Sequence, residues 1–111
     1  MSNELIPECE VEKALDFLRD NAVEIGQAKA DAVRAERMVR HHKALEMQRH
    51  NGLPVSAQER EAYASRAYVT ALEEEAVAAG EYERLKSLRE AAAMRIEAWR
   101  TSCSNYRAMK L

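Results

Sequence analysis

The sequence predicts an all-α fold, an antiparallel hairpin of two long helices that is coiled-coil-like and is completed by self-association. Three observations support this prediction. The second half of the chain repeats apolar positions at spacings of three and four, the 111 residues are rich in helix formers, and a single turn signal divides them. Three glycines, two prolines and 5% aromatic residues are too few for a sheet protein of this size.

The stripe in the second half runs for more than five heptads without interruption. Its members are Tyr68, Ala71, Glu75, Ala78, Tyr82, Leu85, Arg89, Ala92, Ile96, Trp99, Cys103 and Tyr106. A single helix cannot bury such a stripe, so the chain must fold back on itself or bind partners. Because Glu75 and Arg89 place charges on the stripe, we expect them to set the register of the hairpin. The expected partners are Lys29 for Glu75, and Asp16 or Asp20 for Arg89.

A first helix is predicted over residues 8–50. Pro7 suits a first turn, and Glu8, Glu10 and Glu12 put negative charge at the end that the helix dipole favours. Its predicted stripe consists of Val11, Leu15, Leu18, Ala22, Ile25, Ala28 or Lys29, Ala32, Ala35 and Val39. The alanine-rich middle lets a neighbouring helix approach closely.

Residues 51–56 are the predicted turn. Gly52 suits a left-handed cap, Pro54 prevents the first helix from continuing, and Ser56 with Glu59 has the spacing of a capping box. A second helix is predicted over residues 57–107. Ser65 leaves open a break there, with residues 57–64 as a short separate turn of helix. Residues 1–111 are interpreted as a single helical domain.

The charges at the two ends agree with an antiparallel pairing. Residues 1–24 carry seven acidic residues against Lys13 and Arg19, whereas residues 95–111 carry four basic residues against Glu97 alone. A short connection between long helices sets these ends side by side. A second basic cluster lies near the turn and comprises Arg34, Arg37, Arg40, Lys43, Arg49, Arg60 and Arg66.

Composition and spacing exclude several classes of protein. A net charge of −2 excludes a globally basic nucleic-acid binder, although not a local basic patch. No signal peptide or bilayer-spanning apolar run is visible, so we expect a cytoplasmic protein that makes no membrane contact. Cys9 and Cys103 have no metal-ligand spacing; antiparallel helices leave a disulfide between them open, but reduced thiols are the default.

No constellation for catalysis is visible. The sequence contains no nucleophile–base set and no phosphate-cradling glycine loop, so we predict no enzyme, no cofactor and no small-molecule substrate. His41 and His42 diverge by about 100° around a helix, and no metal site is predicted from them. The run Glu73, Glu74 and Glu75 also spreads around a helix, so we interpret it mainly as a solvent-exposed face and not as a cation site.

Basic and aromatic residues carry the remaining functional signal. The candidate nucleic-acid-binding residues are Arg37, Arg40, Lys43, Arg95, Arg100 and Arg107. Base stacking would come from whichever of Tyr63, Tyr82, Trp99 and Tyr106 is exposed. The expected packing residues are Tyr82, Leu85, Ile96, Trp99 and Tyr106, because they fall on the apolar stripe.

Part of the second helix resembles small helical proteins that bacteriophages encode beside recombination and single-strand-binding genes. The matching pattern consists of Ser65-Arg66-Ala67-Tyr68, Glu81-Tyr82-x-x-Leu85-Lys86, Arg95-Ile96-Glu97-Ala98-Trp99-Arg100 and Asn105-x-Arg107. The layout is also distantly similar to that of the recombination mediator protein of T4-type phages. This resemblance implies a helical protein that oligomerises, binds single-stranded DNA and helps to load a recombinase.

Two hypotheses follow. The first is a non-enzymatic accessory protein of phage DNA recombination or replication, which acts in the host cytoplasm as a homo-oligomer. Its partners would be single-stranded DNA and a recombinase or single-strand-binding protein. The alternative is a protein–protein interaction module without nucleic-acid contact, such as an adaptor or an inhibitor of a host protein, or else a structural coiled coil.

Overall fold

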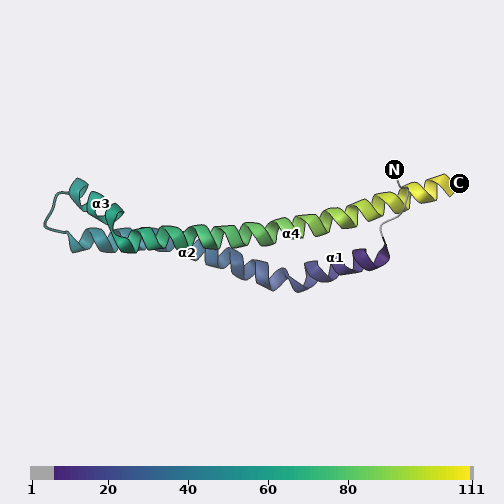
Figure 1. Cartoon of the computed structure of the whole chain (residues 1–111), viewed down its shortest axis with the longest axis horizontal. Coiled ribbons are helices and arrows are strands. Elements are labelled where there is room, and N and C mark those ends of the chain that lie inside the picture. Colours follow the sequence, from purple (N-terminus) through teal and green to yellow (C-terminus); the bar gives the residue numbers. More distant parts are fainter. Residues whose placement is uncertain (1–6, 111) are drawn as a thin grey trace. The chain divides into compact units, whose positions relative to one another are not determined.

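The computed structural model describes residues 7–110, which form four helices and no strand (Figure 1). The helices are α1 (Glu8–Asp20), α2 (Ala22–Arg49), α3 (Val55–Ala64) and α4 (Arg66–Lys110). The all-α prediction is therefore confirmed. The end of α4 lies three residues beyond the predicted limit at residue 107.

The chain divides into two compact units, which we describe separately. The terminal unit contains the described residues up to Ile25 and those from Arg84 onward, and the turn unit is Gly26–Glu83. In the terminal unit, Glu10 contacts Arg95 and Leu18 contacts Arg89, so α1 and α4 run in opposite directions there. In the turn unit, α2 contacts α4 through Lys29 and Tyr82.

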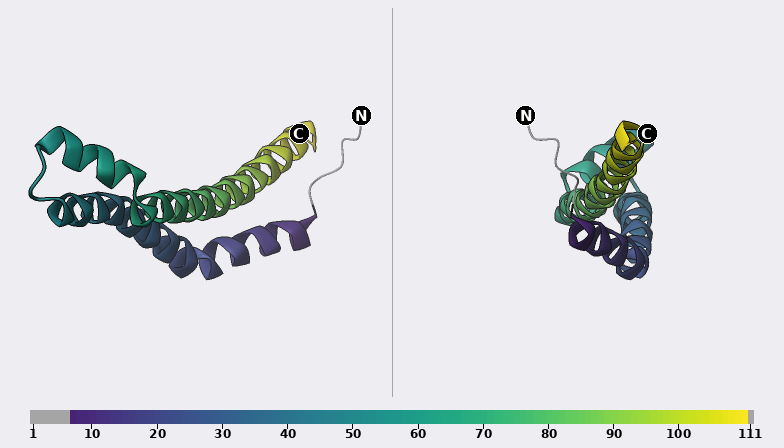
Figure 2. Two further views of the ribbon diagram at one scale, coloured as in Figure 1. Left: turned by 60° about the vertical axis from the view of Figure 1, so that its left-hand side comes forward. Right: turned by 90° about the vertical axis from the view of Figure 1, so that its right-hand side faces the viewer.

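Helix α3 belongs wholly to the turn unit and returns the chain from α2 to α4 (Figure 2). Its Tyr63 accepts a hydrogen bond of 2.8 Å from the Lys43 ammonium of α2. The same ring packs edge-on against Tyr68 of α4, with ring centroids 5.2 Å apart. Tyr63 thus connects the three helices of this unit.

The burial pattern of α4 confirms its predicted stripe, which we call the seam. Every seam residue from Tyr68 to Cys103 is buried or half-buried. Between these two positions, every residue off the seam is exposed, with the single exception of the half-buried Ser102. Tyr106 departs from the prediction that it packs, because it is 47% exposed.

The seam predicted for the first helix is wrong at two positions. Leu15 is 51% exposed and Ala22 is exposed, whereas Ala14 and Asn21 are buried. The true spacing from Val11 is three, four, three and four, the same alternation that α4 shows. Leucine and alanine are buried more often than asparagine, so residue type favours positions 15 and 22, whereas the spacing of the structure selects positions 14 and 21.

One helix was predicted over residues 8–50, but the structure has two helices that meet at Asn21. Asn21 is 3% exposed, and its Nδ2 donates to Glu24 Oε2 at 3.0 Å. Its Oδ1 has no hydrogen-bond partner among the described residues. Asparagine competes with regular helical bonding through its own side chain, and this tendency accounts for the end of α1 at this position.

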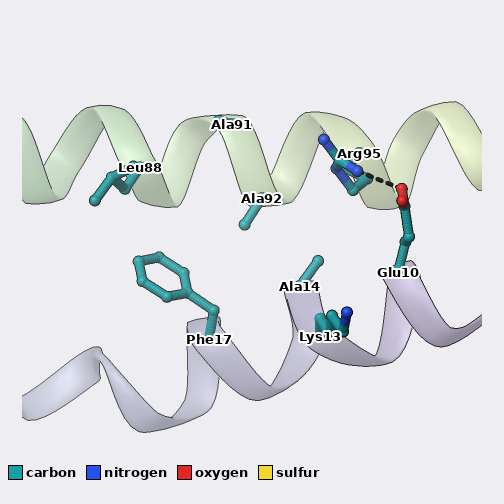
Figure 3. Close-up of a pocket in the computed structure, with 8 residues that line it drawn as sticks. All are labelled: Glu10, Lys13, Ala14, Phe17, Leu88, Ala91, Ala92 and Arg95. Atoms are coloured by element: carbon teal, nitrogen blue, oxygen red, sulfur yellow. Dashed lines mark hydrogen bonds and ion pairs between the residues drawn. The ribbon is translucent and has the colours of Figure 1, made fainter.

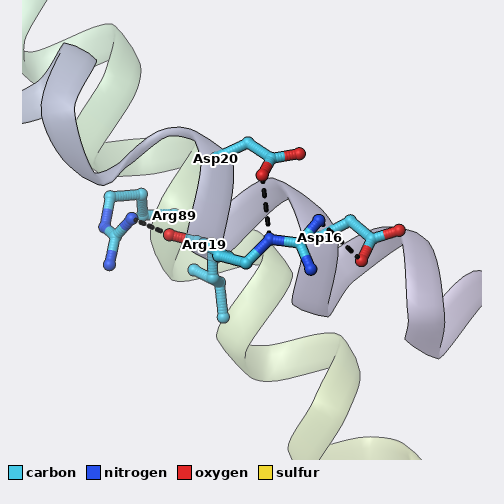
Figure 4. A network of polar contacts seen from close by, with 5 residues as sticks. Asp16, Arg19, Asp20 and Arg89 are labelled. Atoms are coloured by element: carbon cyan, nitrogen blue, oxygen red, sulfur yellow. Dashed lines mark hydrogen bonds and ion pairs between the residues drawn. The ribbon is translucent and has the colours of Figure 1, made fainter.

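Arg89 occupies its seam position beside the end of α1, but it does not pair with Asp16 or Asp20 as predicted. Its Nη1 donates to the Leu18 carbonyl oxygen at 2.9 Å (Figure 4). The last carbonyls of a helix lack intrahelical donors and carry partial negative charge, so a guanidinium is a suitable cap.

The two aspartates pair with Arg19 of their own helix instead, at 3.4 Å for Asp16 and 2.9 Å for Asp20. The hydrogen bond from Arg19 to Asp20 raises the pKa of the Arg19 guanidinium, and the charges of Asp20 and Asp16 add to this effect.

The predicted pairing of Lys29 with Glu75 is also replaced. The Lys29 ammonium lies over the ring of Tyr82, 4.9 Å from the ring centroid. The face of an aromatic ring carries partial negative charge and attracts a cation at this distance. Tyr82 thus occupies a seam position of α4, and its ring also contacts Lys29 of α2.

The turn differs from its prediction in detail. Gly52 does not adopt a positive φ, so it is not a left-handed cap. Helix α3 begins at Val55 with Pro54 at its N-cap, and no capping bond is made by a side chain, so the predicted Ser56–Glu59 capping box is absent. Ser65 does interrupt the helix, and its Oγ accepts a 3.2 Å hydrogen bond from the Tyr68 amide.

The described residues bury few apolar side chains. The buried set is Val11, Ala14, Ala28, Ala62, Ala71 and Leu85, and none of the larger side chains is fully enclosed. Four of these six are alanines, which let helix backbones approach closely but remove little apolar surface from water. Leu85 is the largest buried residue of the set, at 2% exposed.

We expect Leu85→Ala to lower the free energy of unfolding by about 2–4 kcal/mol, because it leaves a cavity in the seam. The matched control is Leu88→Ala in the same helix, where the leucine is 43% exposed and its loss should cost less than about 1.5 kcal/mol. Urea unfolding followed by circular dichroism measures both. Equal losses of unfolding free energy at the two positions would contradict the assignment of Leu85, and not Leu88, to the seam.

Replacement of Asn21 by leucine should raise the free energy of unfolding by about 1 kcal/mol. The substitution removes a buried carbonyl oxygen that lacks a partner, and leucine has nearly the same volume. The same urea experiment tests it, and a destabilised variant would show that the asparagine is required at the break.

Candidate nucleic-acid interface

The last turns of α4 gather aromatic and basic side chains around one hollow. The hollow has a volume of about 390 Å³ and is lined by Trp99, Arg100, Cys103, Tyr106 and Arg107. We call these five residues the C-terminal surface. They come together because positions three and four apart in sequence are neighbours on a helix.

The rings of this surface differ in exposure. Trp99 is half-buried, whereas Tyr106 is 47% exposed and has the Lys110 ammonium 5.1 Å from its ring centroid. Trp99 therefore fits the predicted packing role better than Tyr106 does. Tyr106 offers a ring face and a nearby cation to a ligand.

The two arginines of the surface are exposed. Arg100 pairs with Glu97 at 2.9 Å, and both side chains are 67% exposed, so water screens this ion pair strongly. Arg107 forms no ion pair or hydrogen bond with any other residue in the range 7–110. Both guanidinium groups are accessible to a phosphate.

Arg95, the third arginine predicted in this region, is held by α1. Its Nη1 donates to Glu10 Oε2, and the two side chains are 51% and 44% exposed (Figure 3). Beside this ion pair lies a second hollow of about 300 Å³, which is lined by Glu10, Lys13, Ala14, Phe17, Leu88, Ala91, Ala92 and Arg95. The general match between an acidic start and a basic end was predicted from the sequence, but this individual pair was not.

The second candidate group, Arg37, Arg40 and Lys43, lies on α2 in the turn unit. Arg40 pairs with Glu36 at 3.5 Å, while Arg37 is exposed. Lys43 donates to the Tyr63 hydroxyl, and this hydrogen bond raises the pKa of the Lys43 ammonium above its ordinary value. Of the three cations, only Arg37 has no partner within residues 7–110.

The remaining predicted packing residues lie on the seam. Leu85 is buried, whereas Tyr82 and Ile96 are half-buried. Both cysteines are free thiols: Cys9 is exposed and Cys103 is half-buried. Within residues 7–110 no three histidine, cysteine, aspartate or glutamate side chains are grouped so that they could hold a metal ion.

None of the helices in the described part of the chain is long and apolar enough to cross a bilayer. Comparison of the chain with protein-family models, with curated proteins and with solved structures finds no match.

Proposed function

We propose that this chain is a non-enzymatic accessory protein of phage DNA recombination or replication, which self-associates and handles single-stranded DNA through the C-terminal surface. The observation that carries the proposal is the hollow at the end of α4, where rings and guanidinium groups lie together. Proteins that bind single strands without sequence preference combine cations for the backbone with aromatic faces for the bases. The sequence resemblance to phage recombination proteins supports the biological setting, and the host cytoplasm is the compartment it implies.

The C-terminal surface is a better candidate than the cluster on α2. Arg107 has no competing acid among the described residues, and Tyr106 exposes nearly half of its side chain. On α2, Lys43 is engaged by Tyr63 and Arg40 by Glu36, so binding there would first break existing contacts. A net charge of −2 also favours a short local contact over a long basic track.

Self-association is supported by the scarcity of buried apolar surface. The buried set of the described chain is dominated by alanines, while Val69, Leu72, Val77 and Met94 are exposed on α4. Exposed apolar side chains along a helix are typical of an interface. In this proposal, the opposed helix segments of the two units form one coiled-coil-like hairpin, and copies of it cover one another's apolar faces. A recombinase or a single-strand-binding protein would then bind the assembly.

A protein-interaction module without nucleic-acid contact is the second candidate. It is favoured by the acidic outer surface of α1, where Glu8, Glu12 and Asp16 are all exposed. Such a surface suits a basic partner protein. Binding to single-stranded DNA separates the two candidates.

A labelled oligo-dT should bind the wild-type chain at low salt, with an affinity that falls steeply as salt rises. Arg107→Gln removes one phosphate contact, so it should weaken binding and reduce the log–log salt slope by about 0.7. The control is Arg60→Gln, which changes the net charge equally at an exposed arginine of α3. Fluorescence anisotropy measures all three proteins, and absence of wild-type binding at low salt would refute nucleic-acid handling.

Light scattering at micromolar concentration tests the assembly independently of DNA. We expect a mass that is a multiple of 12.6 kDa, because the exposed apolar side chains of α4 need a covering surface. A single species at the mass of one chain would contradict self-association and leave the DNA contact to be judged by its own experiment.

A further inference from the structure

We propose that α1 is an internal competitor for the nucleic-acid surface of α4, and that its Glu10 carboxylate occupies a cation that single-stranded DNA would otherwise contact. This inference rests on the proposed function. It adds a regulatory contact within the chain, in which an acidic helix takes the place of the phosphate backbone.

The contact itself has the required chemistry. Arg95 donates to Glu10 through a charge-assisted hydrogen bond, the kind of bond that a guanidinium also forms with a phosphate oxygen. Arg95 lies four residues before Trp99, so it borders the C-terminal surface on the same helix. With Glu10 bound to Arg95, single-stranded DNA can use Arg100 and Arg107 but not a free Arg95.

The surrounding charges of α1 strengthen the competition. Glu8, Glu12 and Asp16 are exposed on the same short helix, and Lys13 and Arg19 are its only cations. A phosphate that approaches Arg95 meets this negative field as well as the carboxylate bound to it. It therefore competes with Glu10 for the Arg95 guanidinium.

Helix α1 is held lightly enough for Glu10 to be displaced. Only Val11 and Ala14 are buried within it, and the hollow of about 300 Å³ next to Phe17 separates part of it from α4 (Figure 3). The helix ends at Asn21, so it can detach without unwinding a longer helix. Segments with few buried apolar contacts open at a low free-energy cost.

The coupling is reciprocal. If Glu10 lowers the affinity of α4 for a single strand, then a bound strand must weaken the hold of α4 on α1 by the same factor. Occupancy of the C-terminal surface would therefore loosen the contact between α1 and α4.

The test compares two substitutions that change the net charge equally. Glu10→Gln frees Arg95, whereas Glu12→Gln removes an exposed carboxylate of the same helix that forms no hydrogen bond or ion pair with another described residue. Arg95→Gln and the double variant Glu10→Gln/Arg95→Gln complete the set. Affinity for oligo-dT and its salt slope are measured for each full-length protein, and circular dichroism verifies that each one is helical.

We expect Glu10→Gln to raise the affinity by about two- to fivefold, the range that corresponds to loss of one half-exposed ion pair. Its salt slope should steepen by about 0.7, equivalent to one added phosphate contact on a single strand. Glu12→Gln removes the same charge but does not free Arg95, so it should raise the affinity less than Glu10→Gln and leave the salt slope unchanged. The double variant should lose the gain in salt slope. Arg95→Gln breaks the same ion pair but should not raise the affinity, which separates competition from simple loosening of α1.

Hydrogen exchange on the wild-type protein gives a second readout that needs no variant. Saturating oligo-dT should speed amide exchange in α1 while it protects the end of α4. Equal effects of Glu10→Gln and Glu12→Gln, or unchanged exchange in α1, would overturn the inference while the proposed function survives. If none of the proteins binds the oligonucleotide, both fail.

Discussion

The seam of α4 is the constraint on which the rest of the structure depends. It presents one residue to its neighbours every three or four positions, and four of the twelve are small, namely Ala71, Ala78, Ala92 and Cys103. Small side chains bring helices close together but bury little apolar area. Large apolar side chains off the seam, such as Val77 and Met94, remain exposed and available to other molecules.

Two polar residues in the terminal unit separate α1 from α2. Asn21 is buried and ends α1, and Arg89 caps the Leu18 carbonyl from across the helix pair. These two residues make α1 a short separate helix rather than the start of a longer one. A short acidic helix with few buried contacts is suited to reversible pairing with the basic end of α4, and the ion pair between Glu10 and Arg95 is the point where it does so.

The parts of the fold that follow from spacing were predictable. The α4 seam repeats strictly and includes large markers such as Leu85 and Trp99, so the sequence located it correctly. The first seam was harder to predict because the apolar Leu15 is exposed while the polar Asn21 is buried.

The partners of Lys29 and Arg89 were not predictable, since a pattern of charges in the sequence does not indicate a backbone carbonyl or an aromatic face as a partner. Lys29 and Arg89 use these two kinds of partner. Within the C-terminal surface, Arg100 and Arg107 were named as candidates from their charge, and Trp99 and Tyr106 from their place on the stripe and their rings, whereas Cys103 was placed only on the stripe. The hollow of this surface, and the sequestration of Arg95, depend on side-chain conformations that no spacing encodes.

The most direct measurement is photo-crosslinking of a bromodeoxyuridine-substituted single strand to the full-length protein, with the attached peptides identified by mass spectrometry. Aromatic side chains that stack on bases are the groups best placed to react. We expect attachment within the last turns of α4, at Tyr106 or Trp99. Attachment confined to Tyr63 on α3, or no attachment at low salt, would contradict this expectation.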